Sequence, residues 1–142
     1  MEDSIFFHIE DLPDFELVQD QLRKEWLINL AKAESFTILN LNYVFCSDEY
    51  LHKINVEYLD HDTLTDIITF DNSEEEKVIE GDIFISVKRV QDNAEKYKVS
   101  EFNELNRVLA HGLLHLVGYM DKSESDKKLM REKENYYLNL WK

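Results

Sequence analysis

His111-Gly112-Leu113-Leu114-His115-Leu116-Val117-Gly118-Tyr119-Met120-Asp121 is the stretch that organises the rest of this chain. Its two histidines stand four residues apart. On a helix this spacing puts both imidazoles on one face, with Cβ atoms roughly 5–6 Å apart. That separation suits two ligands of a single metal ion.

A glycine and an aspartate extend this pattern. Gly118 can take the left-handed conformation that ends a helix, so the chain can turn back after it. Asp121 follows three residues later, where a reversed chain brings its carboxylate to the same ion. A histidine pair alone is more often structural than metal-binding, but here three independent features agree.

The candidate ligands are therefore His111, His115 and Asp121, which offer two nitrogens and one oxygen. Zinc accepts such donors at roughly 2.0–2.2 Å, and a site with three protein ligands keeps a fourth position for water. That arrangement is typical of catalytic rather than structural zinc. The sequence predicts one Zn²⁺ ion as cofactor.

The bulk composition predicts one domain over residues 1–142, because this length is near the usual domain size and 44% of the residues are hydrophobic. The single cysteine, Cys46, excludes an internal disulfide and is expected to pack in the core. The acidic start lacks the long apolar run of a signal peptide or membrane span. We expect a cytoplasmic protein without a membrane partner.

The charge is distributed unevenly along the chain. The net charge of −14 disfavours non-specific nucleic-acid binding. Residues 1–85 carry 5 Lys/Arg and 21 Asp/Glu, whereas residues 86–142 carry 11 and 9, so the histidine motif lies in the less acidic part. Basic side chains follow the motif, either as an ordinary solvated helix face or as a substrate-facing one. They are Lys122, Lys127, Lys128 and Arg131.

Apolar periodicity predicts four strands. They cover about residues 4–9, 37–45, 67–70 and 81–87, and the last two are expected to pair as a hairpin around the acidic tip at 73–76. The second strand alternates, with one side expected to face the core. The residues on that side are Leu39, Leu41, Tyr43 and Phe45.

Helices are predicted between and after these strands. The first is expected to start at Pro13-Asp14 with an apolar stripe, and Ser47 is a candidate cap of the second. The stripe consists of Phe15, Val18, Leu22, Trp26, Leu30 and Ala33. The last three helices cover about 86–97, 100–117 and the residues after Ser123. The order βαβαββααα predicts an α/β (α+β) fold, a mixed four-stranded sheet covered by about five helices.

The motif from His111 to Asp121 resembles the signature of the YbeY family. Members of this family are bacterial rRNA maturation factors that act as zinc-dependent endoribonucleases. The resemblance extends over roughly residues 36–140. Besides His111 to Tyr119 and Asp121, the matching segments are Asn55-Val56-Glu57-Tyr58, Thr65-Asp66-Ile67-Ile68-Thr69-Phe70 and Gly81-Asp82-Ile83.

Two positions depart from the family pattern. The family motif usually ends Gly-Tyr-Asp-His, whereas Met120 and Asp121 occupy the last two places here. Aspartate can still bind zinc, and its charge should make a bound water less acidic than three neutral histidines would. Leu59 stands where the family commonly has an arginine that contacts RNA phosphate, and leucine cannot make that charged contact.

The resemblance implies an endoribonuclease that acts on single-stranded or loop RNA near the 3′ end of small-subunit rRNA, with ribosomal or ribosome-associated proteins as partners. Water at the open zinc position would serve as nucleophile or base, and the attacking group stays open between water and the adjacent ribose 2′-hydroxyl. Asp66 and Asp82 are candidate catalytic carboxylates by family position, and structural turn residues otherwise. Lys122 or Lys128 would replace the missing arginine in binding RNA.

Two other functions fit parts of the pattern. The spacing His-x-x-x-His-x-x-Gly-x-x-Asp also suits a metzincin-like metallopeptidase, but Gly112 stands where zinc proteases place the glutamate that activates water. The third hypothesis is a ribosome-assembly factor that retains a metal for stability without catalysis. Leu59 and the acidic N-terminal part favour that hypothesis.

Overall fold

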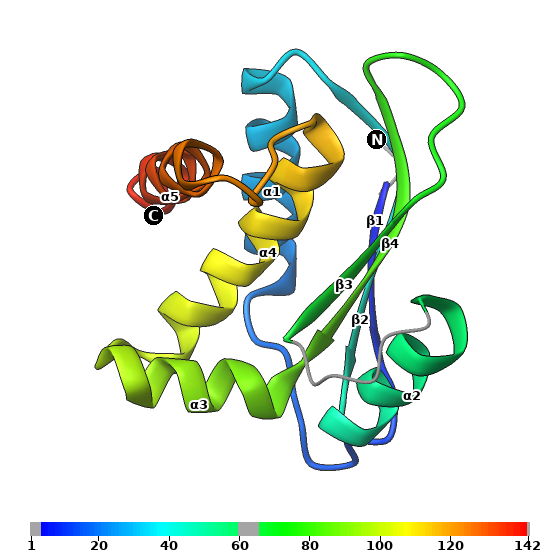
Figure 1. The fold of residues 1–142 in the computed structure, drawn as a ribbon, viewed down its shortest axis with the longest axis vertical. Helices are drawn as coiled ribbons and strands as arrows, with labels where there is room; N and C mark the ends of the chain where they lie inside the picture. Colours follow the sequence, from blue (N-terminus) through cyan, green and yellow to red (C-terminus); the bar gives the residue numbers. More distant parts are fainter. Residues whose placement is uncertain (1–3, 60–65, 142) are drawn as a thin grey trace.

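A computed structural model describes residues 4–59 and 66–141 of the chain. Within these residues the expected order βαβαββααα and the α+β class are confirmed (Figure 1). The elements are β1 (Ile5–Ile9), α1 (Asp20–Ala33), β2 (Thr37–Cys46), α2 (Asp48–Leu59), β3 (Ile67–Asp71), β4 (Val78–Ser86), α3 (Val87–Tyr97), α4 (Glu101–Val117) and α5 (Glu124–Leu138).

The four strands form one mixed sheet in the order β1-β2-β4-β3. β2 runs parallel to both β1 and β4, whereas β3 is antiparallel to β4 at the edge. The expected hairpin of β3 and β4 is therefore confirmed, and its acidic tip is an exposed turn. Helices connect the parallel strands, as parallel pairing requires.

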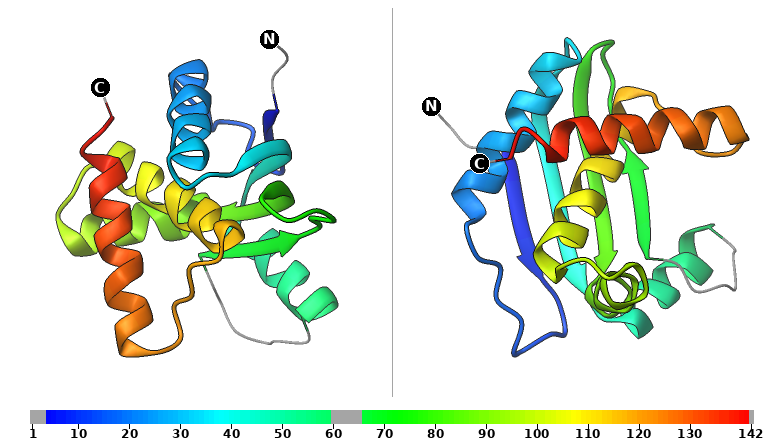
Figure 2. Two further views of the ribbon diagram at one scale, coloured as in Figure 1. Left: turned by 90° about the horizontal axis from the view of Figure 1, so that it is seen from above. Right: turned by 90° about the vertical axis from the view of Figure 1, so that its left-hand side faces the viewer.

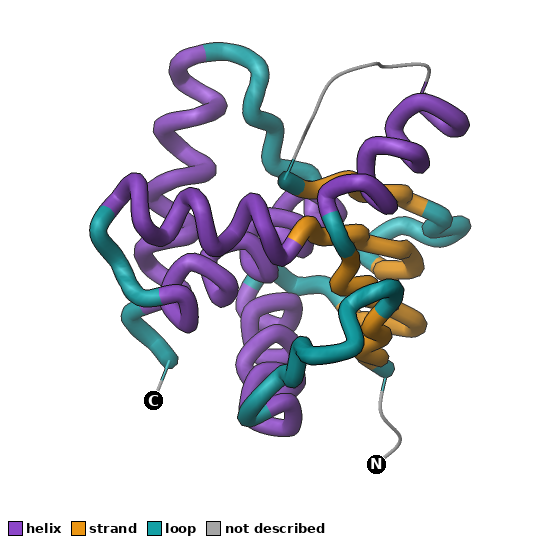
Figure 3. The backbone as a smooth tube through the Cα atoms, turned by 90° about the horizontal axis from the view of Figure 1, so that it is seen from below, coloured by secondary structure: helices purple, strands orange, loops and turns teal. Residues whose placement is uncertain are grey.

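Helices cover both faces of the sheet unequally (Figures 2 and 3). α1 and α4 pack on one face, α2 lies on the other, and α3 and α5 pack against α4. The larger core fills the space between the sheet and α1 and α4, and it includes Leu27, Leu41, Tyr43, Phe45, Ile83 and Leu109. Cys46 is fully buried in the smaller cluster beneath α2, as expected. α4 is thus held between the sheet and α5.

Two contacts hold α4 close to the sheet just where the histidine motif begins. Gly112 lies against the sheet, and a Cβ atom there would come within 2.9 Å of Ile83 Cδ1 and 3.1 Å of Ile67 Cδ1. One turn earlier, the Tyr43 hydroxyl donates a hydrogen bond of 2.8 Å to the Leu109 carbonyl. The small residue and this buried hydrogen bond fix the face of α4 that points away from the sheet.

The first helix begins later than the sequence predicted. α1 starts at Asp20 rather than near Pro13, because Gln19 has a left-handed backbone (φ 55°) that cannot continue a helix. The proposed stripe is wrong at both ends, since Val18 and Leu22 are 56% and 46% exposed and Ala33 is also exposed. Phe15 still reaches the core from the preceding loop, where its ring lies 5.6 Å from that of Phe45.

The second strand departs from strict alternation. The pairing of β2 with β4 shifts between Ile38 and Asn40, which turns Ile38 inward and leaves Leu39 60% exposed. The expected inward position of Leu39 is therefore wrong, because one irregular residue exchanges the two faces of a strand. Leu41, Tyr43 and Phe45 are fully buried, as predicted.

The serines expected to cap helices do so. Ser47, Ser100 and Ser123 accept hydrogen bonds of 3.0–3.1 Å from backbone N–H groups three residues later. His61, Asp62 and the side chain of Leu59 lie outside the described residues. In the described part, no helix combines the length and apolar character needed to cross a bilayer.

Candidate metal centre

The two motif histidines project from α4 beside the face that packs on the sheet, and His111 lines a cleft together with Asp66 and Ile67 at the sheet edge. Their rings lie 4.7 Å apart, nearly perpendicular to each other, at 82°. Both side chains are about one quarter exposed, 23% for His111 and 26% for His115. Both rings therefore lie at a boundary between the core and solvent.

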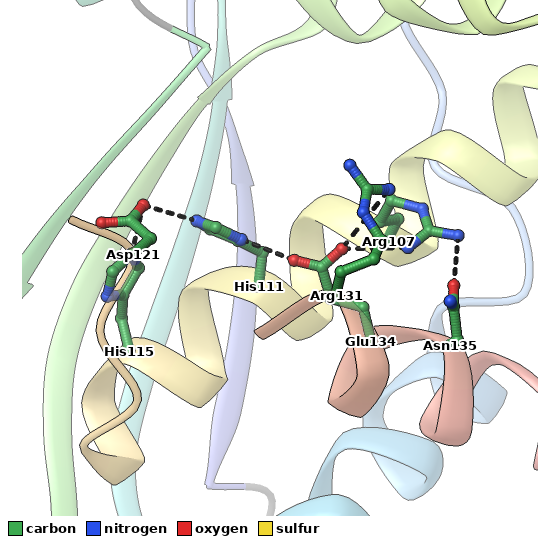
Figure 4. Close-up of polar contacts among 7 residues, drawn as sticks. All are labelled: Arg107, His111, His115, Asp121, Arg131, Glu134 and Asn135. Carbon is green, nitrogen blue, oxygen red and sulfur yellow. Dashed lines mark hydrogen bonds and ion pairs between the residues drawn. The ribbon is translucent and has the colours of Figure 1, made fainter. Parts of the chain in front are cut away.

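Gly118 reverses the chain after α4. Its φ of 121° is a conformation that side-chain-bearing residues rarely adopt. The N–H groups of Gly118 and Tyr119 both reach back to the Leu114 carbonyl, at 3.1 and 3.0 Å, and so close the last turn of the helix. The reversed segment returns Asp121 to the histidine face, as Figure 4 shows.

The three side chains meet at Asp121 Oδ2. This oxygen lies 3.2 Å from Nε2 of His115 and 3.5 Å from Nε2 of His111. Two donors about 2.0–2.1 Å from a tetrahedral zinc ion are themselves about 3.3–3.4 Å apart. One ligand atom from each residue lies within 4.8 Å of the other two, so this His-His-Asp group could hold one metal ion.

A carboxylate at the C-cap of α1 anchors the segment between Gly118 and Asp121. The Tyr119 hydroxyl donates to Glu34 Oε1 at 2.7 Å, while Lys133 donates to Oε2 at 3.2 Å and Tyr137 also donates to Oε2. Burial alone would raise the pKa of Glu34, but these hydrogen bonds hold it below its ordinary value. Glu34 thus joins α1, the reversed segment and α5.

A second carboxylate holds the His111 ring. Nδ1–H of His111 donates a hydrogen bond of 2.7 Å to Oε2 of Glu134, a residue of α5 whose side chain is only 5% exposed. With its proton on Nδ1, the imidazole presents the Nε2 lone pair toward Asp121. Carboxylate–histidine–metal arrangements of this kind fix the tautomer and the orientation of a ligating ring.

Two arginines support the buried Glu134 (Figure 4). Arg107 donates to Glu134 Oε1 at 2.9 Å and to Asn135 Oδ1 at 2.8 Å, and Arg131 lies 3.8 Å from the same Glu134 oxygen. Burial raises the pKa of Glu134, but the hydrogen bonds from His111 and Arg107 outweigh it and lower that pKa. The carboxylate therefore stays charged in a site that excludes most water.

A cleft of about 330 Å³ opens beside this group. It is lined by residues of α3, α4, α5 and the start of β3, including Asp66, Tyr97, Glu104, His111, Asp121 and Lys127. Lys127 and Arg131 contribute positive charge to the cleft. Lys122 and Lys128, the sequence candidates for RNA contact, are exposed but lie outside the residues that line it.

The two candidate catalytic carboxylates lie in different places. Asp66 lines the same cleft as His111. Asp82 lies in another cleft beside α2, where it accepts hydrogen bonds of 3.1 Å from Asn42 and 3.2 Å from Asn72. Of these two carboxylates, only Asp66 shares a cleft with His111.

Sequence reasoning missed Glu34, Arg107 and Glu134. Arg107 stands four residues before His111, so helical spacing could have placed it on the same face. Glu134 comes 23 residues after His111 and Glu34 comes 85 residues before Tyr119. Those two contacts depend on how α1 and α5 pack, which helical periodicity does not reveal.

Fold and site together define a small α+β protein with a candidate metal centre on its central helix. Comparison with known families agrees with this class. The family described as "Endoribonuclease YbeY" matches residues 11–142. The chain belongs to the YbeY family.

Individual relatives match over nearly the whole chain. Endoribonuclease YbeY of Cytophaga hutchinsonii is 55% identical over 141 residues, which cover 99% of this chain and 98% of the relative. Endoribonuclease YbeY of Flavobacterium johnsoniae is 55% identical over 122 residues, with coverage of 86% and 87%. The solution structure of TM1509 from Thermotoga maritima matches with a TM-score of 0.66 and 27% identity, over 95% of this chain and 87% of that one.

Glu134→Gln is predicted to lower zinc affinity about 10- to 100-fold, because the charge that fixes the His111 ring is lost. Competition with a fluorescent zinc chelator measures this affinity. Glu132→Gln, an exposed position on the same helix, is the matched control and should bind zinc like the unmodified protein. Equal affinities of the two variants would contradict the orienting role of Glu134.

Glu34→Gln is predicted to lower the free energy of unfolding at pH 7 by roughly 1–3 kcal/mol, because three donors lose a charged acceptor. The folded-state pKa of Glu34 is lowered, so its contribution is present above the unfolded pKa of about 4.3 and is lost as pH falls below it. Denaturant titrations at several pH values should show the two proteins converging in acid. Glu25→Gln, exposed on the same helix, is the control, and an equal effect there would refute the role of Glu34.

Proposed function

We propose that this chain is a zinc-dependent endoribonuclease that cleaves single-stranded RNA during maturation of the small-subunit rRNA 3′ end, in the cytoplasm and together with ribosomal or ribosome-associated proteins. The observation that carries the proposal is the meeting of His111, His115 and Asp121 beside a cleft with basic residues. The printed name of the relatives, Endoribonuclease YbeY, supports the reaction class. The whole chain then acts as one metal-dependent hydrolase domain.

In this proposal His111 and His115 hold the ion through Nε2 and Asp121 through a carboxylate oxygen. A bound zinc ion supplies Lewis acidity toward a phosphoryl oxygen and makes a nucleophile available at neutral pH. Glu134 keeps the His111 ring in its ligating orientation through the Nδ1–H hydrogen bond. Asp121 is the ligand that differs from the family histidine, and its charge reduces the net charge of the centre.

Residues of the cleft complete the proposed chemistry. Asp66 is the proposed acceptor of the proton that the attacking hydroxyl loses, because it shares the cleft with His111. Lys127 and Arg131 are the proposed phosphate contacts, and the Arg131 side chain is 58% exposed. They take the role that the sequence assigned to Lys122 and Lys128.

The packing of Gly112 weighs against a metallopeptidase. A zinc protease needs a glutamate at this position to activate water. Here the position faces Ile83 and Ile67 on the sheet, so a side chain there would have to displace these two isoleucines. The same packing is compatible with a nuclease, in which the substrate approaches through the cleft beside His111.

Removal of the metal is predicted to abolish cleavage of a single-stranded rRNA fragment, and zinc should restore it. Asp121→Ala should lower both zinc content and cleavage rate by at least about 100-fold, because one of three ligands is lost. Asp121→His, which restores the family residue, should retain both the zinc content and the cleavage rate. Gel assays and elemental analysis measure the two quantities.

Glu124→Ala, an exposed carboxylate three residues after Asp121, is the control for these variants and should behave normally. Cleavage that survives chelation, or that is equal in Asp121→Ala and Glu124→Ala, would refute a metal-dependent nuclease. A stoichiometric metal without any cleavage would favour the assembly-factor hypothesis instead.

Lys127→Ala is predicted to weaken binding of a single-stranded RNA oligonucleotide, whereas Lys128→Ala should leave it unchanged. The two neighbours differ in that only Lys127 lines the cleft. Each lost phosphate contact reduces the slope of log affinity against log salt by about 0.7. Fluorescence anisotropy over a salt series measures the slope, and equal slopes for both variants would contradict the proposed RNA path.

A further inference from the structure

The cleft continues beyond the candidate metal centre. His111 and Asp121 line it, and so do Asn93 and Tyr97 of α3. None of these α3 residues has a role in holding a metal or in the proposed phosphate contacts. The part of the cleft between Tyr97 and Glu104 therefore needs an explanation of its own.

Helical spacing fixes how far this second part lies from the metal ligands. Glu104, Arg107 and His111 recur at intervals of three and four residues, so they share one face of α4. Seven residues of helix separate Glu104 from His111 by about 10 Å along the axis. The ribose and base of a nucleotide can bridge that distance when its phosphate lies at the metal centre.

The side chains in this part suit a flat ring with polar edges. Ile67, Val108 and Met130 supply apolar surface, and Tyr97 offers an aromatic ring that is 55% exposed. Asn93 carries both a donor and an acceptor. Apolar surface with a few polar groups is typical of small-molecule sites, and about 330 Å³ is at the lower end of their volumes.

Charge in the cleft distinguishes a base from a second phosphate. Glu104 is buried, at 6% exposure, and lines the cleft, and burial raises the pKa of its carboxyl. Asp66 lies in the same cleft. Carboxyl groups do not attract a phosphate, whether charged or neutral, whereas the edge of an uncharged base can donate to or accept from them. Arg107, the nearest cation on α4, already binds Glu134 and Asn135.

We propose that the part of the cleft bounded by Asn93, Tyr97 and Glu104 is a nucleobase subsite, which receives the unstacked base of the nucleotide next to the scissile phosphate. The proposal rests on the proposed nuclease function and deepens it. Single-stranded RNA is commonly recognised by stacking of splayed bases on aromatic rings and by hydrogen bonds to their edges. Such a subsite gives the enzyme a preference for unpaired nucleotides, because a paired base cannot enter.

The test compares how tightly the zinc-loaded protein binds nucleoside 5′-monophosphates and ribose 5-phosphate. Ribose 5-phosphate has the same sugar and phosphate but no base. NMR titration measures both affinities and the chemical-shift changes of the Asn93 side-chain amide and the Tyr97 ring. We expect the nucleotides to bind about 10-fold more tightly than ribose 5-phosphate. Tyr97→Ala should bind the nucleotides no more tightly than ribose 5-phosphate, while its affinity for ribose 5-phosphate stays unchanged.

Tyr136→Ala is the matched control, since Tyr136 is 56% exposed, lies on α5 and does not line the cleft. This variant should still bind the nucleotides about 10-fold more tightly than ribose 5-phosphate. Equal affinity for the nucleotides and ribose 5-phosphate, or an equal effect of the two tyrosine variants, would overturn the subsite. This binding measurement does not require cleavage, so base-dependent binding in a protein that cleaves no RNA would refute the nuclease function and leave the subsite standing.

Discussion

The backbone of Gly118, with its φ of 121°, is the constraint on which the rest of the site depends. It ends α4 immediately after the second histidine and sends the chain back, so that Asp121 comes within 3.2 Å of His115. A helix that continued through this position would carry the carboxylate away from the imidazoles. The conformation costs a glycine little and other residues more, so a single small residue allows the three candidate ligands to converge.

Three contacts with other parts of the fold stabilise that convergence. The sheet holds α4 through the close contact at Gly112, α1 anchors the reversed segment through Glu34 and Tyr119, and α5 fixes the His111 ring through Glu134. Functional groups need this kind of support, because a ligand set is precise only when its neighbours hold it. The acidic net charge of the chain is compatible with an RNA substrate because basic residues are concentrated on the helices beside the site.

Local patterns predicted the strands, the helix caps and the three converging side chains, because each depends on residues close together in the sequence. Prediction failed where backbone geometry intervened, as at Gln19, whose left-handed backbone delays α1, and between Ile38 and Asn40, where a register shift exposes Leu39. It also missed contacts between distant elements. Glu134 reaches His111 only because α5 packs on α4, and the same packing decides that Lys127 lines the cleft while Lys122 and Lys128 do not.

The central claim is that one ion is held through Nε2 of both histidines and a carboxylate oxygen of Asp121. A crystal structure of the zinc-loaded protein, with anomalous scattering recorded at the zinc edge, tests it most directly. We expect one strong peak about 2.0–2.2 Å from these three atoms, with the Nδ1 bond from His111 to Glu134 intact. A peak elsewhere, or coordination through Nδ1 of His111, would contradict this account.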